Sequence, residues 1–485
     1  MPRRPHHLAR GILRNAGAMF LVGAFAKGAG LVIAILVARF LGPDAMGLYA
    51  ILFSIAFLLE TFISLGMSDS LVRDIAARPA ESRALYLASL KLVLRVSLVP
   101  AAALVLAASI FGDDDATRAS LLVIAAGTPV SAAFVVSQAA LQGKERVLLL
   151  TWVSFLARVL SLVGLLFAFS HGANLAAAFG SRVLFQGACL AVYLAVLARD
   201  RQPSIDGHST RSLLTRSVPF AMNKAIRELS VRLPSFVLPA VAGLAAAGIF
   251  DAANRLRSTL AMVMSASIVG LMPAFARSLA GSATDADGLV RYSIKYMCVA
   301  MSVLATAVAL LSNWIIDLLY GVEFAGASRP LQILIWAQVV TAVDAVLQQA
   351  MLARGDVYPA VRHSAAGVLV QFAMILIGAA LLGLAGAALA VLLGSLLTLA
   401  LDLRFVVRKV TPIPIWRFAV APLAAAAVIG TVMLFLDHKP IAIRLAAAVG
   451  TWTLTMALFR VLPRQELRFM MQLLKRGRER QPQTS

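Results

Sequence analysis

The sequence predicts an all-helical protein embedded in a membrane, and three observations carry that prediction. Sixty per cent of the 485 residues are hydrophobic, the mean hydropathy is +0.87, and only 14% are charged. A soluble chain of this length does not need so much apolar sequence to fill its core. The apolar residues gather in runs of about 20 residues or more, the length that a helix needs to cross a bilayer. Basic residues concentrate in alternate loops between the runs, as they do in multi-pass membrane proteins.

Fourteen runs are predicted to span the membrane. They are expected at residues 16–40, 46–67, 85–110, 119–141, 148–170, 173–197, 217–241, 247–272, 292–316, 329–353, 361–382, 384–406, 415–436 and 441–462. The first follows a basic tail, as a secretory signal would, but it continues to Phe40 and is therefore expected to remain as a span. The segment from Arg464 to Arg480 alternates basic and apolar residues, which is typical of a helix lying on the membrane surface.

The distribution of Lys and Arg predicts the orientation. The chain contains 44 Lys and Arg against 23 Asp and Glu. Thirty of the 44 fall in the tails and loops of one side, and four on the other: Arg118, Arg329, Lys439 and Arg444. Loops rich in Lys and Arg stay in the cytoplasm. We therefore expect a multi-pass membrane protein with both termini cytoplasmic.

The chain also repeats itself. ARFLGPDAMGLYAILFSI (38–55) aligns with PAVAGLAAAGIFDAANRL (239–256). The alignment places Gly42 on Gly243, Gly47 on Gly248, Tyr49 on Phe250 and, further along, Gly172 on Gly383. Six spans separate matching positions, so the two copies share one orientation. Parallel repeats of this kind predict two pseudo-symmetric bundles of six helices around a central cavity.

This repeat divides the chain into four expected parts. Residues 1–200 form the first bundle, 201–412 the second, 413–463 an additional pair of spans and 464–485 a basic cytoplasmic tail.

One predicted span carries an unusual stripe of charge. Between Ser217 and Gly243, the residues Lys224, Arg227, Glu228 and Arg232 recur at helical spacing, so they share one face. Charge at membrane depth is kept mainly where it faces a bundle interior or a watery cavity. The stripe therefore indicates the wall of a cationic cavity. The alternative is structural, with Lys224 reaching the interface and Glu228 pairing with Arg232.

Other charges inside the predicted spans are candidates for the same cavity. Lys27 and Glu60 lie at similar depth and are placed to pair, and either is a possible gate or substrate contact. Arg158 and Arg182 have no acid on their own helices, so they either face substrate or pair across helices. The candidates for cavity cations are Lys27, Arg158, Arg182, Lys224, Arg227, Arg232 and Arg255.

The acids of the spans are candidates for ion coupling or gating: Glu60, Glu228, Asp251 and Asp344. Asp251 and Arg255 are spaced i, i+4 and are expected to pair, while Arg257 is expected to point elsewhere. Asp344 lies in a polar patch with two glutamines, which suits either a cation or helix packing. Asp402 is expected at the cytoplasmic interface.

Motifs for catalysis, cofactors and nucleic acid are not found in the sequence. There is no GxxxxGK[ST], HExxH or GxSxG, and Cys189 and Cys298 lie inside apolar runs. The positive charge lies between spans rather than on a soluble nucleic-acid module. We expect no enzymatic activity, no metal or cofactor, and no nucleic-acid partner.

The stretch LVARFLGPDAMGLYAILFSIAFLLETFISLGMSDSLVRDIA (36–76) resembles the signature of Wzx-type polysaccharide-biosynthesis flippases. These belong to the multidrug/oligosaccharidyl-lipid/polysaccharide exporter superfamily. RSVPFAMNKAIRELSVRL and GIFDAANRLRSTLAMVMSASIVGLMPAFARSLA are similar to the start of that family's second half.

The resemblance implies a location in a bacterial inner membrane. It also implies alternating-access transport of an undecaprenyl-diphosphate-linked oligosaccharide from the cytoplasmic to the periplasmic leaflet, beside a glycan polymerase and chain-length partners. It also implies a cationic cavity, to which Lys27, Lys224, Arg227, Arg232 and Arg255 correspond.

Four alternatives remain open. A lipid II flippase fits the same chemistry, and a multidrug exporter has the same superfamily fold but normally carries acids in its first spans. A membrane glycan polymerase or ligase usually has a large external loop, and the external loops expected here are short. A static scaffold of a glycan-assembly complex leaves the charged stripe unexplained.

Overall fold

The fold was analysed in a computed structural model that describes residues 5–64, 67–112, 114–199, 210–261, 283–354 and 356–409, and six single residues between 443 and 454. For residues 5–27, 210–221 and 283–292, and for single positions including Lys224, it describes the backbone alone. Predicted spans thirteen and fourteen, apart from those six residues, and the basic tail lie outside the described residues.

The described chain is helical and contains no strand. Its first half consists of α1 (Pro5–Ser64), α2 (Met67–Ala77), α3 (Ser82–Ile110), α4 (Asp115–Gly143), α5 (Val147–Ser170) and α6 (Ala176–Ala198). Its second half consists of α7 (Thr210–Ala242), a helix over 244–261, α9 (Ala283–Tyr320), α10 (Ser328–Ala353) and α11 (Val357–Lys409). Short 3-10 turns, Pro79–Glu81 and Val322–Ala327, precede α3 and α10. The prediction of an all-helical membrane protein is confirmed.

Two of these helices are bent pairs of spans. The backbone of α1 leaves helical geometry at Gly42 (φ 80°), and that of α11 at Gly383 (φ 59°). Glycine adopts positive φ without the steric penalty of a side chain, so each bend lies where the sequence places one. The bends divide α1 and α11 into the predicted first and second, and eleventh and twelfth, spans.

Within the described residues, eight helices are long and apolar enough to cross a membrane. Helix α7 and the helix over 244–261 are not among them. The described part of α7 carries Arg227, Glu228 and Arg232, and the following helix carries Asp251, Arg255 and Arg257. These two helices are therefore the most highly charged of the predicted spans.

Helix α2 was not expected. The sequence analysis placed residues 68–84 in a loop, because charged residues interrupt the apolar pattern there. In the structure Leu71 and Ile75 of α2 are buried, and the helix packs against α4 and α7. Helix α2 is thus a short amphipathic helix of 11 residues whose apolar side chains pack against neighbouring helices.

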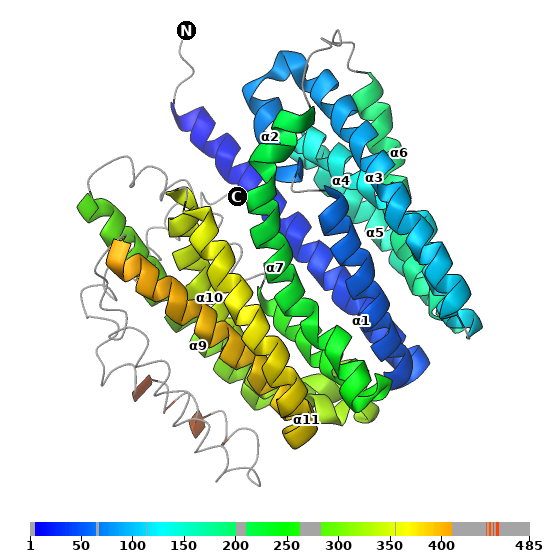
Figure 1. Cartoon of the computed structure of the whole chain (residues 1–485), viewed down its shortest axis with the longest axis vertical. Coiled ribbons are helices and arrows are strands. Elements are labelled where there is room, and N and C mark those ends of the chain that lie inside the picture. Colours follow the sequence, from blue (N-terminus) through cyan, green and yellow to red (C-terminus); the bar gives the residue numbers. More distant parts are fainter. Residues whose placement is uncertain are drawn as a thin grey trace, which may run out of the picture.

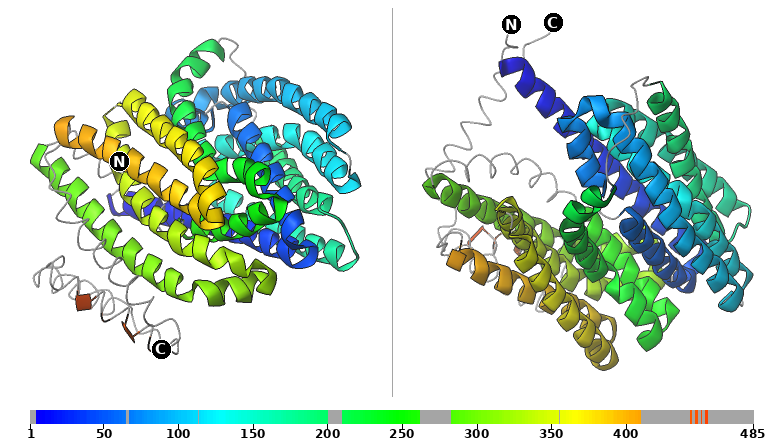
Figure 2. Two further views of the ribbon diagram at one scale, coloured as in Figure 1. Left: turned by 60° about the horizontal axis from the view of Figure 1, so that its bottom comes forward. Right: turned by 45° about the horizontal axis from the view of Figure 1, so that its top comes forward.

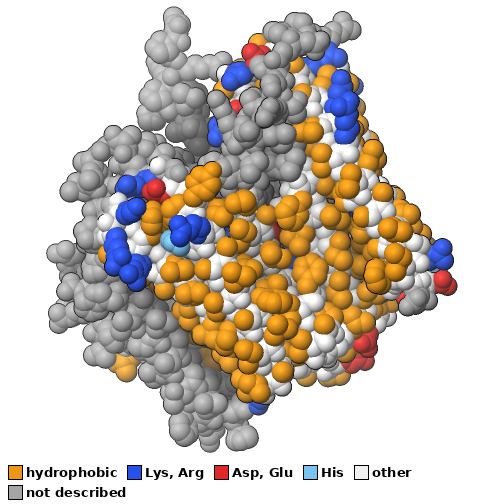
Figure 3. Space-filling view, viewed as in Figure 1, with side chains coloured by type: hydrophobic (Ala, Val, Ile, Leu, Met, Phe, Trp, Pro, Cys, Tyr) orange, Lys and Arg blue, Asp and Glu red, His pale blue; other side chains and the backbone are white. Residues whose placement is uncertain are grey.

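The helices form two groups that meet along α1 and α7 (Figures 1 and 2). Helices α3, α4, α5 and α6 pack in a connected set that joins α1, and α9, α10, α11 and α7 form another. The largest apolar cluster joins both groups and includes Val37, Leu238, Phe250 and Leu331. Hydrophobic side chains cover much of the outer face seen in Figure 3, as expected for a surface in contact with lipid.

The aligned glycines of the repeat share their backbone geometry. Gly42 and Gly243 have φ of 80° and 88°, and Gly172 and Gly383 have φ of 80° and 59°. The aligned Gly47 and Gly248 lie against each other's helix. A Cβ atom on Gly47 would lie 2.1 Å from the Leu244 carbonyl oxygen, and one on Gly248 would lie 2.1 Å from the Pro43 carbonyl oxygen. The two halves are thus in direct backbone contact near the bends at Gly42 and Gly243.

Candidate functional site: a cationic cavity

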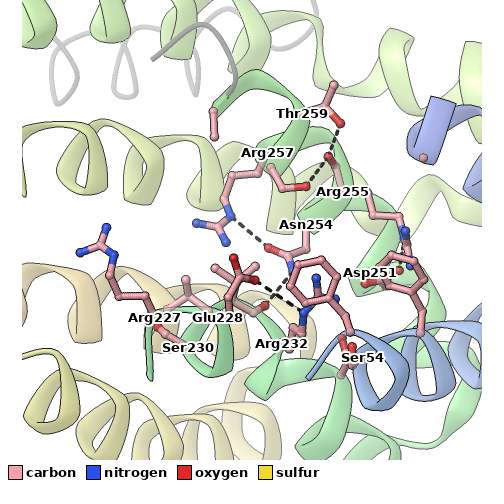
Figure 4. Close-up of a pocket in the computed structure, with 18 of the residues that line it drawn as sticks. Ser54, Arg227, Glu228, Ser230, Arg232, Asp251, Asn254, Arg255, Arg257 and Thr259 are labelled. Atoms are coloured by element: carbon pink, nitrogen blue, oxygen red, sulfur yellow. Dashed lines mark hydrogen bonds and ion pairs between the residues drawn. The ribbon is translucent and has the colours of Figure 1, made fainter. Parts of the chain in front are cut away.

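A cavity of about 540 Å³ lies where the two groups of helices meet (Figure 4). Side chains from α1, α5, α6, α7, the helix over 244–261, α10 and α11 line it. Its polar lining comes mainly from α7 and the following helix, the two segments too charged to qualify as apolar spans. Those charges therefore face the inside of the protein rather than lipid.

Positive charge predominates in this cavity. Among the described residues, the arginines that line it are Arg158, Arg182, Arg227, Arg232, Arg255 and Arg257. The acids that line it are Glu228, Asp251 and Asp344. Six guanidinium groups against three carboxylates leave a site that favours an anion.

The α7 stripe forms one wall of the cavity. Arg227, Glu228 and Arg232 all line it, as their helical spacing predicted. Arg232 Nε lies 3.7 Å from Glu228 Oε2, and Arg227 Nη1 donates a hydrogen bond of 3.1 Å to Asp344 Oδ2 on α10. A cavity wall and a structural Glu228–Arg232 pair were alternative predictions for this stripe, and the structure contains both the wall and the pair. The Lys224 side chain lies outside the described residues.

The helix over 244–261 forms the adjoining wall. Asp251 and Arg255 form the expected i, i+4 ion pair, buried at the cavity edge. Arg257 was expected to point elsewhere, which is wrong, because it also lines the cavity. Its Nε donates a 3.0 Å hydrogen bond to Asn254 Oδ1, and Asn254 Nδ2 donates to the Val231 carbonyl of α7 (Figure 4). The hydrogen bond to Asn254 holds the Arg257 side chain at the cavity wall.

The first half contributes Arg158 and Arg182. Arg182 pairs with Glu60 across helices, one of the two arrangements expected for Arg182; the expected pairing of Glu60 with Lys27 stays a prediction. The Lys27 side chain lies outside the described residues. Arg158 lies 3.5 Å above the Phe185 ring, and within the described residues no acid pairs with it. Glu60 borders a smaller pocket behind Arg182 rather than the main cavity.

An aromatic stripe on α1, which the sequence analysis missed, supports the arginines. Tyr49, Phe53 and Phe57 recur every four residues and therefore share a face. The Arg232 guanidinium lies 3.9 Å from the Phe57 ring centre, and that of Arg255 lies 4.7 Å from those of Tyr49 and Phe53. Cation–π contact stabilises a guanidinium without cancelling its charge. The four-residue aromatic spacing was the signal available in the sequence.

A cluster of buried or partly buried polar side chains, which includes Asp402, His363 and Gln348, lies beside Asp344. Asp402 was expected at the membrane interface, yet it is fully buried. One of its oxygens lies 2.6 Å from His363 Nδ1, and the other accepts a 2.9 Å hydrogen bond from Gln348 Nε2. The apolar pattern of α11 concealed this depth, because Asp402 follows a long apolar run and precedes Arg404.

The described residues hold no group of three or more His, Cys, Asp or Glu arranged to bind a metal ion. Cys189 and Cys298 are both free and buried.

Comparison with known proteins identifies the family. Residues 12–279, more than half of the chain, match the family described as polysaccharide biosynthesis protein. The chain belongs to this family. Its members are membrane transporters rather than enzymes, so the predictions of the family and of no enzymatic activity are confirmed. A search of curated protein sequences found no match.

Solved structures share the fold at low sequence identity. The lipid II flippase MurJ, in an inward closed conformation, superposes with a TM-score of 0.68 at 13% identity, covering 91% of this chain and 98% of MurJ. An inward-facing multidrug MATE transporter gives 0.65 at 16%, covering 81% and 98%. A superfamily transporter from Pyrococcus furiosus, described with a binding pocket of reversed polarity, gives 0.58 at 16%, covering 82% and 95%. The fold is therefore that of the multidrug/oligosaccharidyl-lipid/polysaccharide exporter superfamily.

Proposed function

We propose that this transporter moves an undecaprenyl-diphosphate-linked oligosaccharide from the cytoplasmic to the periplasmic leaflet of a bacterial inner membrane. The observation that carries the proposal is the cavity, in which six arginines face three acids. A diphosphate loses its hydration when it leaves water, and guanidinium groups replace that hydration with charge-assisted hydrogen bonds. The planar fork of arginine suits phosphate oxygens.

The rest of the cavity fits the rest of such a headgroup. Its volume, about 540 Å³, lies in the range of sites for small ligands, roughly 300–1,000 Å³. Hydroxyls and amides, including Ser54, Ser230, Ser235 and Asn254, line it beside the aromatic stripe. Polar groups of this kind hydrogen-bond sugar hydroxyls, while the lipid tail remains in the bilayer.

Transport would follow from exchange between two arrangements of the helix groups, which we take to be the two parallel bundles of the repeat. Residues 1–200 and 201–412 would move against each other about the cavity, with an additional helix pair and the basic tail outside this core. The backbone contact of Gly47 and Gly248 would close one end, which the charge distribution places on the periplasmic side. A glycan polymerase and chain-length proteins are the expected partners on that side.

The charge of the cavity argues against a multidrug exporter, and family membership disfavours a lipid II flippase. A multidrug exporter of this fold that selects cationic compounds would need an acidic cavity, whereas this one has an excess of arginine. A lipid II flippase would bind the same diphosphate, and family membership favours units for polysaccharide synthesis.

The test is headgroup accessibility in sealed vesicles. Arg232→Ala removes a guanidinium held between Glu228 and Phe57. A hydrogen bond to a charged group contributes about 1.5–3 kcal/mol, so translocation should slow roughly tenfold or more. Arg73→Ala, at a side chain 66% exposed on α2, is the matched control and should transport at the normal rate. Unchanged transport in the Lys224→Ala, Arg232→Ala double variant, with normal membrane insertion, would remove the stripe from the mechanism.

A further inference from the structure

A pair of buried carboxyl groups lies at the edge of the cavity. Asp344 on α10 and Asp402 on α11 are 4% and 0% exposed, and Gln348, one helical turn after Asp344, donates a hydrogen bond to Asp402, so the two carboxyl groups belong to one buried cluster. Two carboxylates this close in a buried site repel each other strongly unless a proton is shared between them. Asp344 also reaches the cavity, because Arg227 is bound to its other oxygen.

The hydrogen bonds around the two carboxyl groups leave one buried oxygen without a donor. Both oxygens of Asp402 already have polar nitrogen partners, Gln348 Nε2 and His363 Nδ1. Asp344 Oδ2 accepts from Arg227, but Asp344 Oδ1 is buried with no partner. An unpartnered buried oxygen is costly. A proton on Asp344 donated to Asp402 would satisfy that oxygen and remove the repulsion.

The surrounding charges favour this arrangement over a bound metal. Helix α7 contributes Arg227, and α11 contributes Arg362, His363 and Asp402. Sodium and other hard cations need a shell of oxygen ligands, whereas nitrogens face Asp402 from two directions. Among the described residues, no three or more His, Cys, Asp or Glu side chains are arranged to bind a metal ion.

We infer that Asp344 and Asp402 bind one proton between them, and that this proton controls Arg227. When the pair is protonated, its charge falls and Asp344 holds Arg227 less strongly, so Arg227 is available to an anion in the cavity. When the proton leaves, Asp344 competes with the anion for the same guanidinium. Because such coupling is reciprocal, binding of an anion must draw a proton onto the pair. This second part rests on the proposed function, and the first does not.

The proton itself can be observed without transport. In infrared spectra of the purified protein in lipid nanodiscs, the C=O stretch of a buried protonated carboxyl should be present at neutral pH. Asp344→Asn and Asp402→Asn should each remove or shift it. Asp317→Asn, at an exposed carboxylate on α9, is the matched control and should leave it unchanged. Absence of the band in the unmodified protein, or a band unaffected by both variants, would overturn the shared proton.

The link to Arg227 is tested by proton uptake. The probe is a diphosphate diester with two small alkyl groups, whose charge is constant around neutral pH. Its binding to the unmodified protein and to Asp317→Asn should take up protons from a weakly buffered solution. Asp344→Asn should bind without proton uptake and, at alkaline pH, about tenfold more tightly than the unmodified protein.

The outcomes of these experiments separate the two ideas. Binding with no proton uptake in the unmodified protein, or binding governed by sodium instead of pH, would overturn the control of Arg227. If the diester does not bind at all, the proposed function fails, and the infrared band still decides whether the proton is shared.

Discussion

At the scale of single residues, Arg158 and Arg257 have no acidic partner among the described residues, whereas Arg227, Arg232 and Arg255 each pair with an acid. Arg158 lies on Phe185, Arg232 on Phe57, and Arg257 is hydrogen-bonded to the neutral Asn254. Burial disfavours charge, and each of these contacts offsets part of that cost with an aromatic face or an amide. A cavity built in this way retains its attraction for an anion.

Arg257 provides a test of that view, because it has no acidic partner among the described residues. Arg257→Gln keeps much of the length and hydrogen-bonding capacity of the side chain but removes the charge. Binding of the diphosphate diester should weaken about 10- to 100-fold, the loss of a charge-assisted bond. Calorimetric titration measures this, with Arg404→Gln, an exposed position on α11, as the control. Equal affinity in both variants would show that Arg257 does not face the ligand.

Residue pairs were predictable where both partners share one helix. The spacing of Asp251 and Arg255, or of Glu228 and Arg232, determines which side chains meet on an isolated helix. Glu60 with Arg182, and Asp344 with Asp402, join different helices. Their pairing depends on how helices rotate against each other, which periodicity in one segment does not contain. The prediction for Arg257 failed because the cavity is wider than one helical stripe, so Arg255 and Arg257 both line it.

At the scale of helices, glycine determines where the two halves touch. Gly47 and Gly248 allow α1 and the helix over 244–261 to approach until backbone meets backbone. No side chain fits there, because a Cβ atom would lie 2.1 Å from a carbonyl oxygen on either side. The contact is therefore a property of the two helices as a pair.

Gly47→Ala should push the two halves apart at this end. Forcing an extra methyl group into a packed contact costs about 1–3 kcal/mol, which shifts an equilibrium between two arrangements roughly 5- to 150-fold. Spin labels at Asp44 and Val241, both exposed near the contact, should report longer distances by electron resonance.

Gly164→Ala is the control, since no neighbouring atom lies within 4 Å of its added methyl group. Unchanged distances in Gly47→Ala would mean that this contact does not limit how far the halves close.

The sequence repeat anticipated the bends but not every helix. Aligning Gly42 with Gly243 and Gly172 with Gly383 placed four positions that share positive φ. Helix α2 escaped detection because it has only 11 residues, three of them charged. Its burial depends on α4 and α7, which are distant in sequence.

At the scale of the whole molecule, the distribution of basic residues predicts which face meets the cytoplasm. The loop between α3 and α4 and the end of α6 lie at opposite ends of the helices, because α4, α5 and α6 run back and forth between them. The natural cysteines are buried, so introduced ones can be labelled against a low background.

Phe111→Cys should react with a membrane-impermeant maleimide added to intact cells from the periplasmic side. Arg199→Cys should react only after the membrane is opened, because the positive side remains in the cytoplasm. Both positions are exposed. The reverse pattern would invert the direction assigned to transport.

The overall class of the fold followed from hydropathy and length alone, because few structures other than helices can span a bilayer. The described helices follow the predicted spans in order as far as Lys409, and eight of them are long and apolar enough to cross a membrane. What one sequence did not provide is the shape of the cavity, which depends on side chains from seven helical segments meeting at one depth.

The charge carried by α7 and its successor has a consequence for how the protein is made. A charged residue at the centre of a membrane helix opposes insertion by about 2.5–3.5 kcal/mol. The first of these segments carries Lys224, Arg227, Glu228 and Arg232, and the second carries Asp251, Arg255 and Arg257. Neither segment is suited to leave the translocon by itself. During synthesis they would depend on helices already in the bilayer, of which α1 contributes the aromatic rings that Arg232 and Arg255 contact. Biogenesis of the second half is thus conditional on the first, and the same guanidiniums that would hold a cargo also enforce the order of assembly.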